Sequence, residues 1–316
     1  MSEPIPYYTS DQIRERLTFE RLVTALRKGF TEEYLVPPRM HLNFQNPSPA
    51  EKSTLLLMPA VNPGSAVGVK VVTVNPGNSQ QGLPGVQGIY YLSDANTGTP
   101  HALFDAKALT NWRTAATSVL AASFLVKPGA KKLLIVGTGA LAAYLIDAYA
   151  TIDTIEELSI WGRNQERASS LCEMNSETFK KVRVVKTLEE GVQEADIISA
   201  ATFSKEPLIK GSWLKSGQHL DLVGSYRPDM REVDDRVMQQ ANIYVDSIET
   251  APKESGDLAI PLSNGSISLR DIKGDLFGLC KSEVRGRESD EEITVFKSVG
   301  HALEDLIAAQ LIIQTT

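Results

Sequence analysis

The feature that most constrains this chain is a short apolar run that leads directly into a glycine-rich turn, at residues 131–142 (KKLLIVGTGALA). The apolar run at residues 133–136 is typical of a strand buried on both faces of a parallel sheet. Gly137, Gly139 and Ala142 follow with the spacing G-x-G-x-x-A, and an apolar, helix-forming stretch comes next. This order of strand, tight turn and helix start predicts a site for the pyrophosphate of a dinucleotide.

Each small residue of this motif has a physical task. The first glycine allows the sharp turn, the second lets phosphate approach the backbone, and the small third residue lets the helix pack on the strand. A purely structural turn is the alternative, because glycine-rich turns between a strand and a helix are common. A second strand predicted at residues 158–161 follows about one crossover later, which favours a nucleotide-binding domain.

The patterning of the chain differs before and after this turn. Before it, strands are predicted without intervening helices, which indicates an antiparallel or mixed sheet, at residues 39–44, 54–58, 66–74, 88–92 and 101–104. After it, strands and helices alternate as in a doubly wound α/β fold, up to an irregular, glycine-rich return predicted at residues 255–287. Further helices are predicted at residues 10–33, from a Thr110 cap to about residue 126, and within residues 293–313, the last packing on the first region.

Composition and charge exclude several functional classes. The chain has a net charge of −7 and no block of Lys or Arg, which argues against nucleic-acid binding. Residues 1–20 lack the apolar core of a signal peptide, and no apolar run approaches the length of a membrane span. The two cysteines and four scattered histidines have no metal-ligand spacing. We therefore expect a cytoplasmic protein with no metal site and no membrane partner.

Three cations ahead of the glycine-rich turn break local rules. Lys70 interrupts an apolar strand, where burial would tune its pKa toward proton transfer; an edge-strand lysine that discourages aggregation is the alternative. Arg113 falls in the first turn of the helix predicted from Thr110, where a cation beside free N–H groups makes an anion site, unless it is a solvated surface residue. Arg39 follows a proline pair and alone would be read as exposed. Together the three cations suggest a small carboxylate substrate.

The choice of cofactor can be read after the second predicted strand of the nucleotide-binding region. A carboxylate at that place would bind the adenosine ribose of NAD. Here the strand ends in Trp161, Gly162, Arg163 and Asn164, with no acid and with an arginine that can bind a 2′-phosphate. The residues therefore favour NADPH, with NADH as the alternative if Arg163 merely faces solvent.

Six segments, in order and covering nearly the whole chain, resemble the ornithine cyclodeaminase/mu-crystallin family. They are VGVKVVTVNPGN (67–78), ALTNWRTAATSVLAA (108–122), LLIVGTGALA (133–142), SIWGRNQERA (159–168), VGSYRPDMREVD (223–234) and ITVFKSVGHALEDLIAA (293–309). The resemblance implies a homodimer of the α/β class, with a Rossmann-type doubly wound sheet inserted in a discontinuous α+β dimerisation and substrate domain. We predict residues 1–118 and 295–316 for the substrate domain and residues 119–294 for the dinucleotide-binding domain.

The same resemblance implies a set of site residues. Arg39, Lys70 and Arg113 would surround the substrate carboxylate near the nicotinamide, with Lys70 as the catalytic residue. The cofactor-binding residues that we predict are Arg113, Thr114, Gly137, Thr138, Gly139, Ala140, Leu141, Arg163, Asn164, Thr202, Val223 and Ser298.

One departure from the family pattern bears on the reaction. Cyclodeaminases carry an acidic residue shortly before the proline that matches Pro228, and here Tyr226 stands at that place. Together with Arg163, this resembles the ketimine-reductase branch and implies NAD(P)H-dependent reduction of Δ1-pyrroline-2-carboxylate or Δ1-piperideine-2-carboxylate to proline or pipecolate. The alternatives are an ornithine cyclodeaminase, an alanine-dehydrogenase-like amino-acid dehydrogenase and a non-enzymic binding protein.

Overall fold

The computed structural model describes residues 4–45 and 52–314 of the chain. They fall into two units, whose boundaries lie between Arg113 and Thr114 and between Gly300 and His301. The first unit is discontinuous in sequence, and the second is one continuous insertion.

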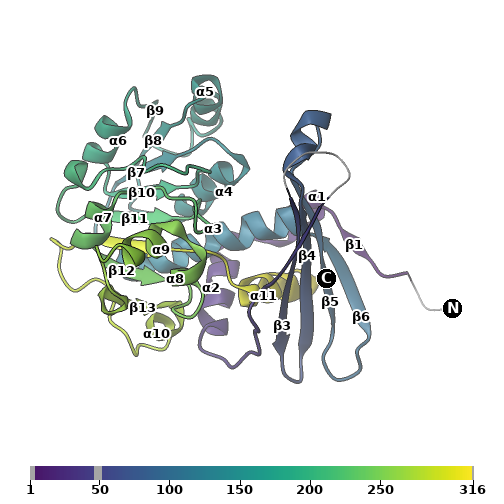
Figure 1. Ribbon diagram of the computed structural model, residues 1–316. Coiled ribbons are helices and arrows are strands. Elements are labelled where there is room, and N and C mark those ends of the chain that lie inside the picture. Colours follow the sequence, from purple (N-terminus) through teal and green to yellow (C-terminus); the bar gives the residue numbers. More distant parts are fainter. Residues whose placement is uncertain (1–3, 46–51, 315–316) are drawn as a thin grey trace. The chain divides into compact units, whose positions relative to one another are not determined.

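The first unit is built on a six-stranded sheet in the order β1-β6-β5-β4-β3-β2 (Figure 1). Neighbours among β2 to β6 are antiparallel, and β1 pairs in parallel with β6 at the edge. The strands are β1 (Tyr7–Tyr8), β2 (Met40–Phe44), β3 (Ser53–Asn62), β4 (Ala66–Val74), β5 (Val86–Asp94) and β6 (Pro100–Asp105), with the 3-10 turn η1 (Pro76–Gln81) after β4. Strands β2 to β6 are thus the five that the sequence predicted.

In the described part of this unit, the helices that lie wholly within it are α1 (Ser10–Arg16), α2 (Phe19–Gly29) and α11 (Ala302–Ile313). The single helix predicted over residues 10–33 is wrong, because α1 ends at Arg16 and Thr18 caps a new helix by accepting a hydrogen bond from the Arg21 N–H. Helix α11 packs on α2, β3 and β4. A Cβ at Gly29 would lie 2.1 Å from Ile307 of α11, so this glycine permits the close approach of α2 to α11.

The inner face of this sheet, which packs on α11, is buried. Met58, Lys70, Tyr90 and Phe104 form a row of cross-strand neighbours, and each is at most 5% exposed. Leu306 of α11 would lie 3.0 Å from a Cβ at Gly68, two residues before Lys70 on the same face of β4. The lysine therefore sits in an otherwise apolar and aromatic row.

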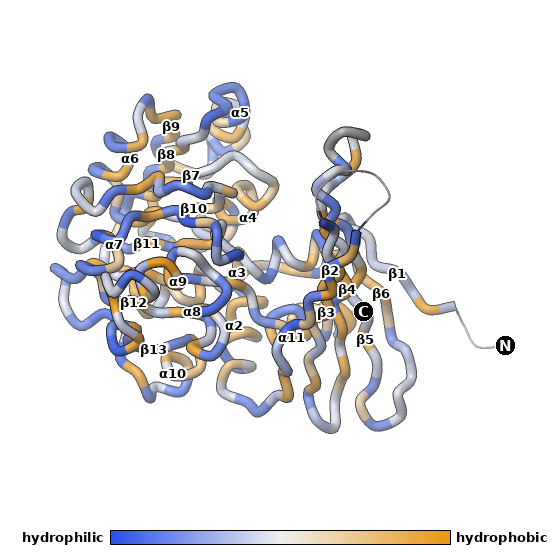
Figure 2. The backbone as a smooth tube through the Cα atoms, viewed as in Figure 1, coloured by the Kyte–Doolittle hydropathy of each residue, from blue (hydrophilic) through white to orange (hydrophobic). Residues whose placement is uncertain are grey.

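The outer face of the sheet is also apolar but stays open to solvent. Met40, Leu57, Val71 and Ile89 form a second row of cross-strand neighbours, one register position away from the buried row. Met40 is 52% and Ile89 40% exposed, whereas Leu57 and Val71 are half-buried. Figure 2 shows the hydrophobic residues that run along β3 and β4.

Helix α3 (Ala106–Leu125) carries the chain from the first unit into the second. It begins four residues before the predicted Thr110 cap, because the Asp105 carboxylate accepts a hydrogen bond from the Ala108 N–H, as an N-cap does (2.8 Å). The prediction that Arg113 lies in the first turn is therefore wrong. Arg113 lies well inside the helix, away from the free N–H groups of its start.

The second unit is an eight-stranded parallel sheet in the order β13-β12-β14-β11-β10-β7-β8-β9 (Figure 1). Its strands are β7 (Lys132–Val136), β8 (Glu157–Trp161), β9 (Lys181–Val184), β10 (Ile197–Ala200), β11 (His219–Leu222), β12 (Asn242–Val245), β13 (Ile272–Asp275) and β14 (Thr294–Lys297). Its helices are α4 (Ala140–Tyr149), α5 (Gln165–Met174), α6 (Leu188–Glu194), α7 (Asp235–Gln240), α8 (Ala251–Glu254), α9 (Gly256–Ser263) and α10 (Leu276–Cys280), with the 3-10 turns η2 (Gly211–Trp213) and η3 (Leu269–Asp271). Strand β7 lies between β8 and β10, so the chain reverses direction across the sheet there, and the predicted doubly wound class is confirmed.

Two sequence-based expectations about this unit are wrong. The stretch predicted as an irregular return, residues 255–287, contains α9, β13 and α10. The segment that begins at residue 293 is not helical at first, because β14 enters the sheet between β11 and β12. Gly300, with a φ of +84°, then ends this strand segment, and α11 begins at Ala302. Strand β14 thus belongs to the second unit, although the predicted boundary lay at residue 295.

Candidate active site

Lys70 of β4 lies in a buried cluster of charged side chains in the first unit. Its Nζ donates to Asp305 Oδ2 at 2.7 Å and to Thr110 Oγ1 at 3.4 Å. The Lys70 side chain is 4% exposed and that of Asp305 is fully buried. Lys70 is therefore neither an edge-strand residue nor solvated. The alternative interpretation, an edge-strand lysine that discourages aggregation, is wrong.

Arg113 joins the same cluster from helix α3. Its Nη1 donates to Glu304 Oε2 at 2.6 Å and its Nε donates to Asp305 Oδ1 at 3.2 Å. The arginine is 5% exposed, and both carboxylates are fully buried. Asp305 thus contacts both cations, one with each oxygen.

Burial and charge set the protonation of this cluster. Burial, together with the charges of Arg113 and Arg39, lowers the pKa of Lys70 to about 8, although the Asp305 carboxylate acts in the opposite direction. Burial alone would raise the pKa of Asp305, but Lys70 and Arg113 outweigh it, so that pKa is lowered. Lys70 is therefore mostly protonated at neutral pH and able to release a proton close to that pH.

Arg39 lies half-buried just before β2, close enough to Lys70 to lower its pKa. The structure thus brings Lys70 and Arg113 into one cluster and places Arg39 near enough to influence the charge of Lys70. Sequence reasoning missed Glu304 and Asp305, the acids that they face. An acid in the first turn of a helix is ordinary, because it complements the helix dipole, so the pair gave no distinct signal.

The glycine-rich turn of the second unit has the geometry that its motif predicts. Gly137 has a φ of +116°, and a Cβ there would lie 2.7 Å from the carbonyl oxygen of Ala201, so only glycine fits. A Cβ at Gly139 would meet no atom within 4 Å, which leaves open space beside the backbone. Ala142 is 1% exposed and packs into the core.

The start of helix α4 suits an anion. Gly139 is its N-cap, with no side chain to accept from the first N–H groups, whereas a side chain caps each of α5, α6 and α7. Thr138, Ala140 and Leu141 complete the turn, and Gly162 at the end of β8 admits the Thr138 side chain, whose Cγ2 would lie 2.5 Å from a Cβ at Gly162. Backbone donors and a helix dipole therefore converge on the open side of Gly139, and the residues present fit a dinucleotide pyrophosphate.

Arg163 and Asn164 follow strand β8. Arg163 is exposed and makes no hydrogen bond or ion pair within the described part of the chain. The side chain of Asn164 caps helix α5 by accepting from the Arg167 N–H at 2.9 Å. Of these two residues, only Arg163 has a side chain without a partner in the described part of the chain.

The other predicted cofactor residues of the second unit mark the carboxyl ends of its strands. Thr202 follows β10, Val223 follows β11 and Ser298 follows β14. Buried carboxylates hold two of them: Glu232 accepts from Thr202, and Asp246 accepts from the Ser298 hydroxyl at 3.2 Å. The remaining one, Thr114, is a buried residue of α3.

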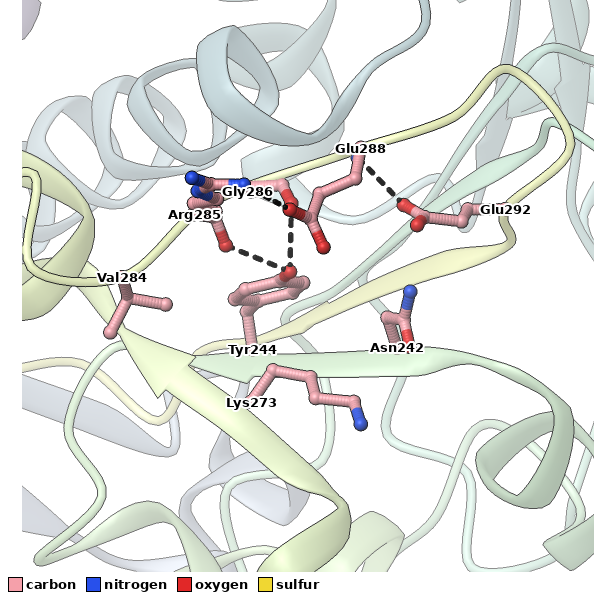
Figure 3. Close-up of a pocket in the computed structure, with 8 residues that line it drawn as sticks. All are labelled: Asn242, Tyr244, Lys273, Val284, Arg285, Gly286, Glu288 and Glu292. Carbon is pink, nitrogen blue, oxygen red and sulfur yellow. Dashed lines mark hydrogen bonds and ion pairs between the residues drawn. The ribbon is translucent and has the colours of Figure 1, made fainter.

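Beyond the charged cluster and the glycine-rich turn, three further features would bear on function: a metal site, a membrane-spanning helix and another pocket. Among residues 4–45 and 52–314, no cluster of His, Cys, Asp and Glu has the geometry of a metal site. In the same residues, no helix has the length and apolar composition that a membrane span requires. A pocket of about 370 Å³ lies beside β12. Figure 3 shows the residues that line it, among which the Tyr244 hydroxyl donates to the main-chain carbonyls of Arg285 and Gly286. No predicted site residue lines this pocket.

Comparison with known proteins agrees with this geometry. The model of the ornithine cyclodeaminase/mu-crystallin family matches residues 8–316. A Δ1-pyrroline-2-carboxylate reductase of Paracoccus denitrificans is 39% identical, over 94% of this chain and 92% of that protein.

Solved structures give the same picture. The Δ1-pyrroline-2-carboxylate reductase of Thermococcus litoralis, in complex with NADH and L-proline, superposes with a TM-score of 0.92 at 30% identity, covering 98% of this chain and 97% of that one. An archaeal alanine dehydrogenase dimer with bound NAD superposes with a TM-score of 0.91 at 27% identity, covering 98% and 95%.

Proposed function

The chain belongs to the ornithine cyclodeaminase/mu-crystallin family, and from this premise we propose that it is an NAD(P)H-dependent ketimine reductase. It reduces the C=N bond of Δ1-pyrroline-2-carboxylate or Δ1-piperideine-2-carboxylate and forms proline or pipecolate. The observation that carries the proposal is the buried cluster of Lys70 and Arg113 in a chain with a nucleotide-binding turn. Reductases of this substrate are among its relatives at 39% identity.

In this proposal the cations of the first unit hold the substrate. Arg113 and Arg39 bind its carboxylate by charge-assisted hydrogen bonds. Lys70 uses two of its three N–H donors on Asp305 and Thr110, and the third serves the substrate. Its proton keeps the imine nitrogen charged, which makes the imine carbon a better hydride acceptor. The nicotinamide cofactor supplies the hydride when bound.

We propose NADPH as the preferred cofactor and NADH as the alternative. The support is Arg163, an exposed cation without an acid after β8. Arg163→Ser should raise the KM for NADPH roughly tenfold or more and leave the KM for NADH nearly unchanged, because only NADPH carries the 2′-phosphate. Equal effects on both cofactors would contradict this role.

We propose that the protein is a homodimer that buries the outer face of the six-stranded sheet. Strands β2 to β5 present Met40, Leu57, Val71 and Ile89 there as one apolar row. Contiguous exposed apolar rows of this kind mark protein–protein interfaces. The cytoplasmic location stays a prediction from the sequence.

The first experiment follows the oxidation of NADPH and NADH in the presence of Δ1-pyrroline-2-carboxylate. Rapid turnover with formation of proline supports the proposal. Ammonia release from ornithine with catalytic NAD would indicate a cyclodeaminase instead. Consumption of pyruvate and ammonium with NADH would indicate an amino-acid dehydrogenase, the second candidate, which the likeness to the archaeal alanine dehydrogenase favours.

A further inference from the structure

Glu232 is a fully buried carboxylate that joins the chain segments after two central strands of the second unit. Its Oε1 accepts from the Thr202 N–H at 2.7 Å and from the Thr202 hydroxyl at 2.8 Å. Its Oε2 accepts from the Gly224 N–H at 2.7 Å. One side chain thus holds the two segments that follow β10 and β11, at Thr202 and Gly224, which we call the exits of these strands.

The main chains of these two exits lie in close contact at Thr202 and Gly224. A Cβ at Gly224 would lie 2.1 Å from the Thr202 carbonyl oxygen and 2.5 Å from Glu232 Oε1. There is therefore no room for a side chain at residue 224. The contact depends on glycine and on the carboxylate that holds it.

Glu232 is itself held by a second layer of buried charge. Its backbone N–H and that of Val233 donate to Asp257 Oδ1, at 2.7 and 3.2 Å. Asp257 Oδ2 lies 3.4 Å from Nζ of Lys297, which ends β14. Lys297 and Asp257 are both fully buried, so the network runs from β14 through α9 to the exits of β10 and β11.

Every group that faces the Glu232 carboxylate in these bonds is a donor. Only an ionised carboxylate can accept from all three, because a protonated acid or an amide would turn a donor of its own toward an N–H or O–H. The exits lie at the carboxyl ends of parallel strands beside β7, which is where doubly wound sheets bind dinucleotides.

We propose that Glu232 is a positioning residue for the cofactor, whose ionised carboxylate fixes the Thr202 and Gly224 segments on which the nicotinamide half is bound. The proposal rests on the proposed function only in assuming that this unit binds a nicotinamide cofactor. It assigns Glu232 no contact with the substrate and no proton transfer to it.

The charge state of Glu232 changes near neutral pH. Burial and the nearby Asp257 raise the pKa of Glu232 to about 7, although Lys297 and the hydrogen bonds from Thr202 act in the opposite direction. The carboxylate is therefore ionised above that pH and increasingly protonated below it. As the pH falls, protonation of Glu232 weakens its hydrogen bonds with Thr202 and Gly224, and cofactor affinity falls as a result.

The test measures the dissociation constant of NADH by fluorescence titration between about pH 6 and about pH 8. NADH is the probe because the 2′-phosphate of NADPH titrates near pH 6 and would add its own pH dependence. Wild-type affinity should weaken severalfold from the upper to the lower end of this range. Glu232→Gln should bind NADH roughly tenfold more weakly or worse, with the pH dependence lost. Glu232→Asp, which keeps the charge, should recover part of both.

Asp229→Asn is the matched control, because Asp229 is an exposed carboxylate on the same loop that pairs with Arg227. It should keep the affinity and the pH dependence of the wild type. A folded Glu232→Gln protein with wild-type affinity and slope overturns the proposal. If that variant does not fold, a wild-type dissociation constant that is flat over this pH range overturns it. Two results separate this inference from the proposed function. Weaker NADH binding by a Glu232→Gln protein that still reduces the imine supports the role of Glu232. The expected pH dependence of NADH affinity in a wild type that reduces no imine supports that role and refutes the proposed function.

Discussion

Lys70 has the burial of a core residue and the charge of a surface residue. Its ammonium group lies in a row with Met58 and Tyr90, and a single carboxylate, Asp305, compensates it directly. A buried cation in such surroundings holds its proton less firmly than one in water. That property suits a proton donor that must act on an imine at neutral pH.

Lys70→Met should abolish turnover, by roughly a hundredfold or more, and leave NADPH binding nearly intact. The reason is that methionine fills the same space but carries no proton, whereas the cofactor-binding turn belongs to the second unit. Steady-state rates and cofactor titration measure the two effects separately. Wild-type rates in this variant would refute the role of Lys70.

The pH dependence of kcat in the wild type is a second test of the role of Lys70. Because the active form of Lys70 is protonated, kcat should fall as the pH rises through about 8, the value to which burial lowers its pKa. The profile is measured at saturating cofactor, so that changes in cofactor affinity do not enter. A rate that rises through this range would contradict the assignment.

Asp305→Asn should destabilise the protein by about 3–5 kcal/mol, because it leaves Lys70 and Arg113 buried without their shared carboxylate. Denaturant unfolding measures the loss. The control is Glu33→Gln, an exposed acid of the same unit, which should change the free energy of unfolding by less than about 0.5 kcal/mol. Equal stability of the two variants would show that the buried cluster contributes little.

At this scale the sequence revealed the cations but not their partners. Lys70 stands out because it breaks the apolar pattern of its strand. Arg113 was singled out by a first-turn position that the structure contradicts, and by the family resemblance. Asp305 lies 235 residues from Lys70 along the chain, and nothing local links the two. Glu232 escaped notice for the same reason, since its bonds join loops after separate strands.

The glycine-rich element between β7 and α4 was predicted from its spacing, and the structure gives its two glycines different tasks. Gly137 is required by the backbone, whereas Gly139 leaves space beside the helix start. Local sequence predicts such an element well, because strand, turn and helix cap are neighbours in the chain. It predicted the start of α3 less well, because both Asp105 and Thr110 can cap a helix and only tertiary packing decides between them.

Substituting these two glycines by alanine should separate folding from binding. Gly137→Ala should lower the thermal unfolding midpoint, because φ is +116° and the new Cβ would lie 2.7 Å from the Ala201 carbonyl oxygen. Gly139→Ala should leave that midpoint nearly unchanged, since its Cβ meets no atom within 4 Å, but weaken cofactor binding. Calorimetry and cofactor titration distinguish the outcomes. Tight binding by Gly139→Ala would argue that phosphate does not approach there.

For the whole molecule, the alternation of strands and helices was enough to predict the doubly wound class. The discontinuity of the first region followed from the helical pattern of the last segment, which was predicted to pack on that region. The short strand β13 was missed because its residues, IKGD, carry almost no apolar signal. Strand β14 was missed because its residues, TVFK, precede a strongly helical stretch. In both cases the partner strand, not the local sequence, decides the structure.

Val71→Glu should convert the proposed dimer into a monomer, because it places a charge in the middle of the apolar outer row. Sedimentation analysis measures the oligomeric state. Thr97→Glu, at an exposed turn between β5 and β6, is the control and should leave the state unchanged. An unchanged dimer in the Val71 variant would place the interface elsewhere.

The position of α11 in the chain sets the order in which the molecule is completed on the ribosome. Strands β1 to β6 are synthesised first, but the helix that covers their inner face and neutralises Lys70 and Arg113 is made after the whole second unit. The continuous second unit can fold as soon as it emerges. The first 113 residues of the nascent chain meanwhile wait with an apolar face and two uncompensated cations until translation delivers α11.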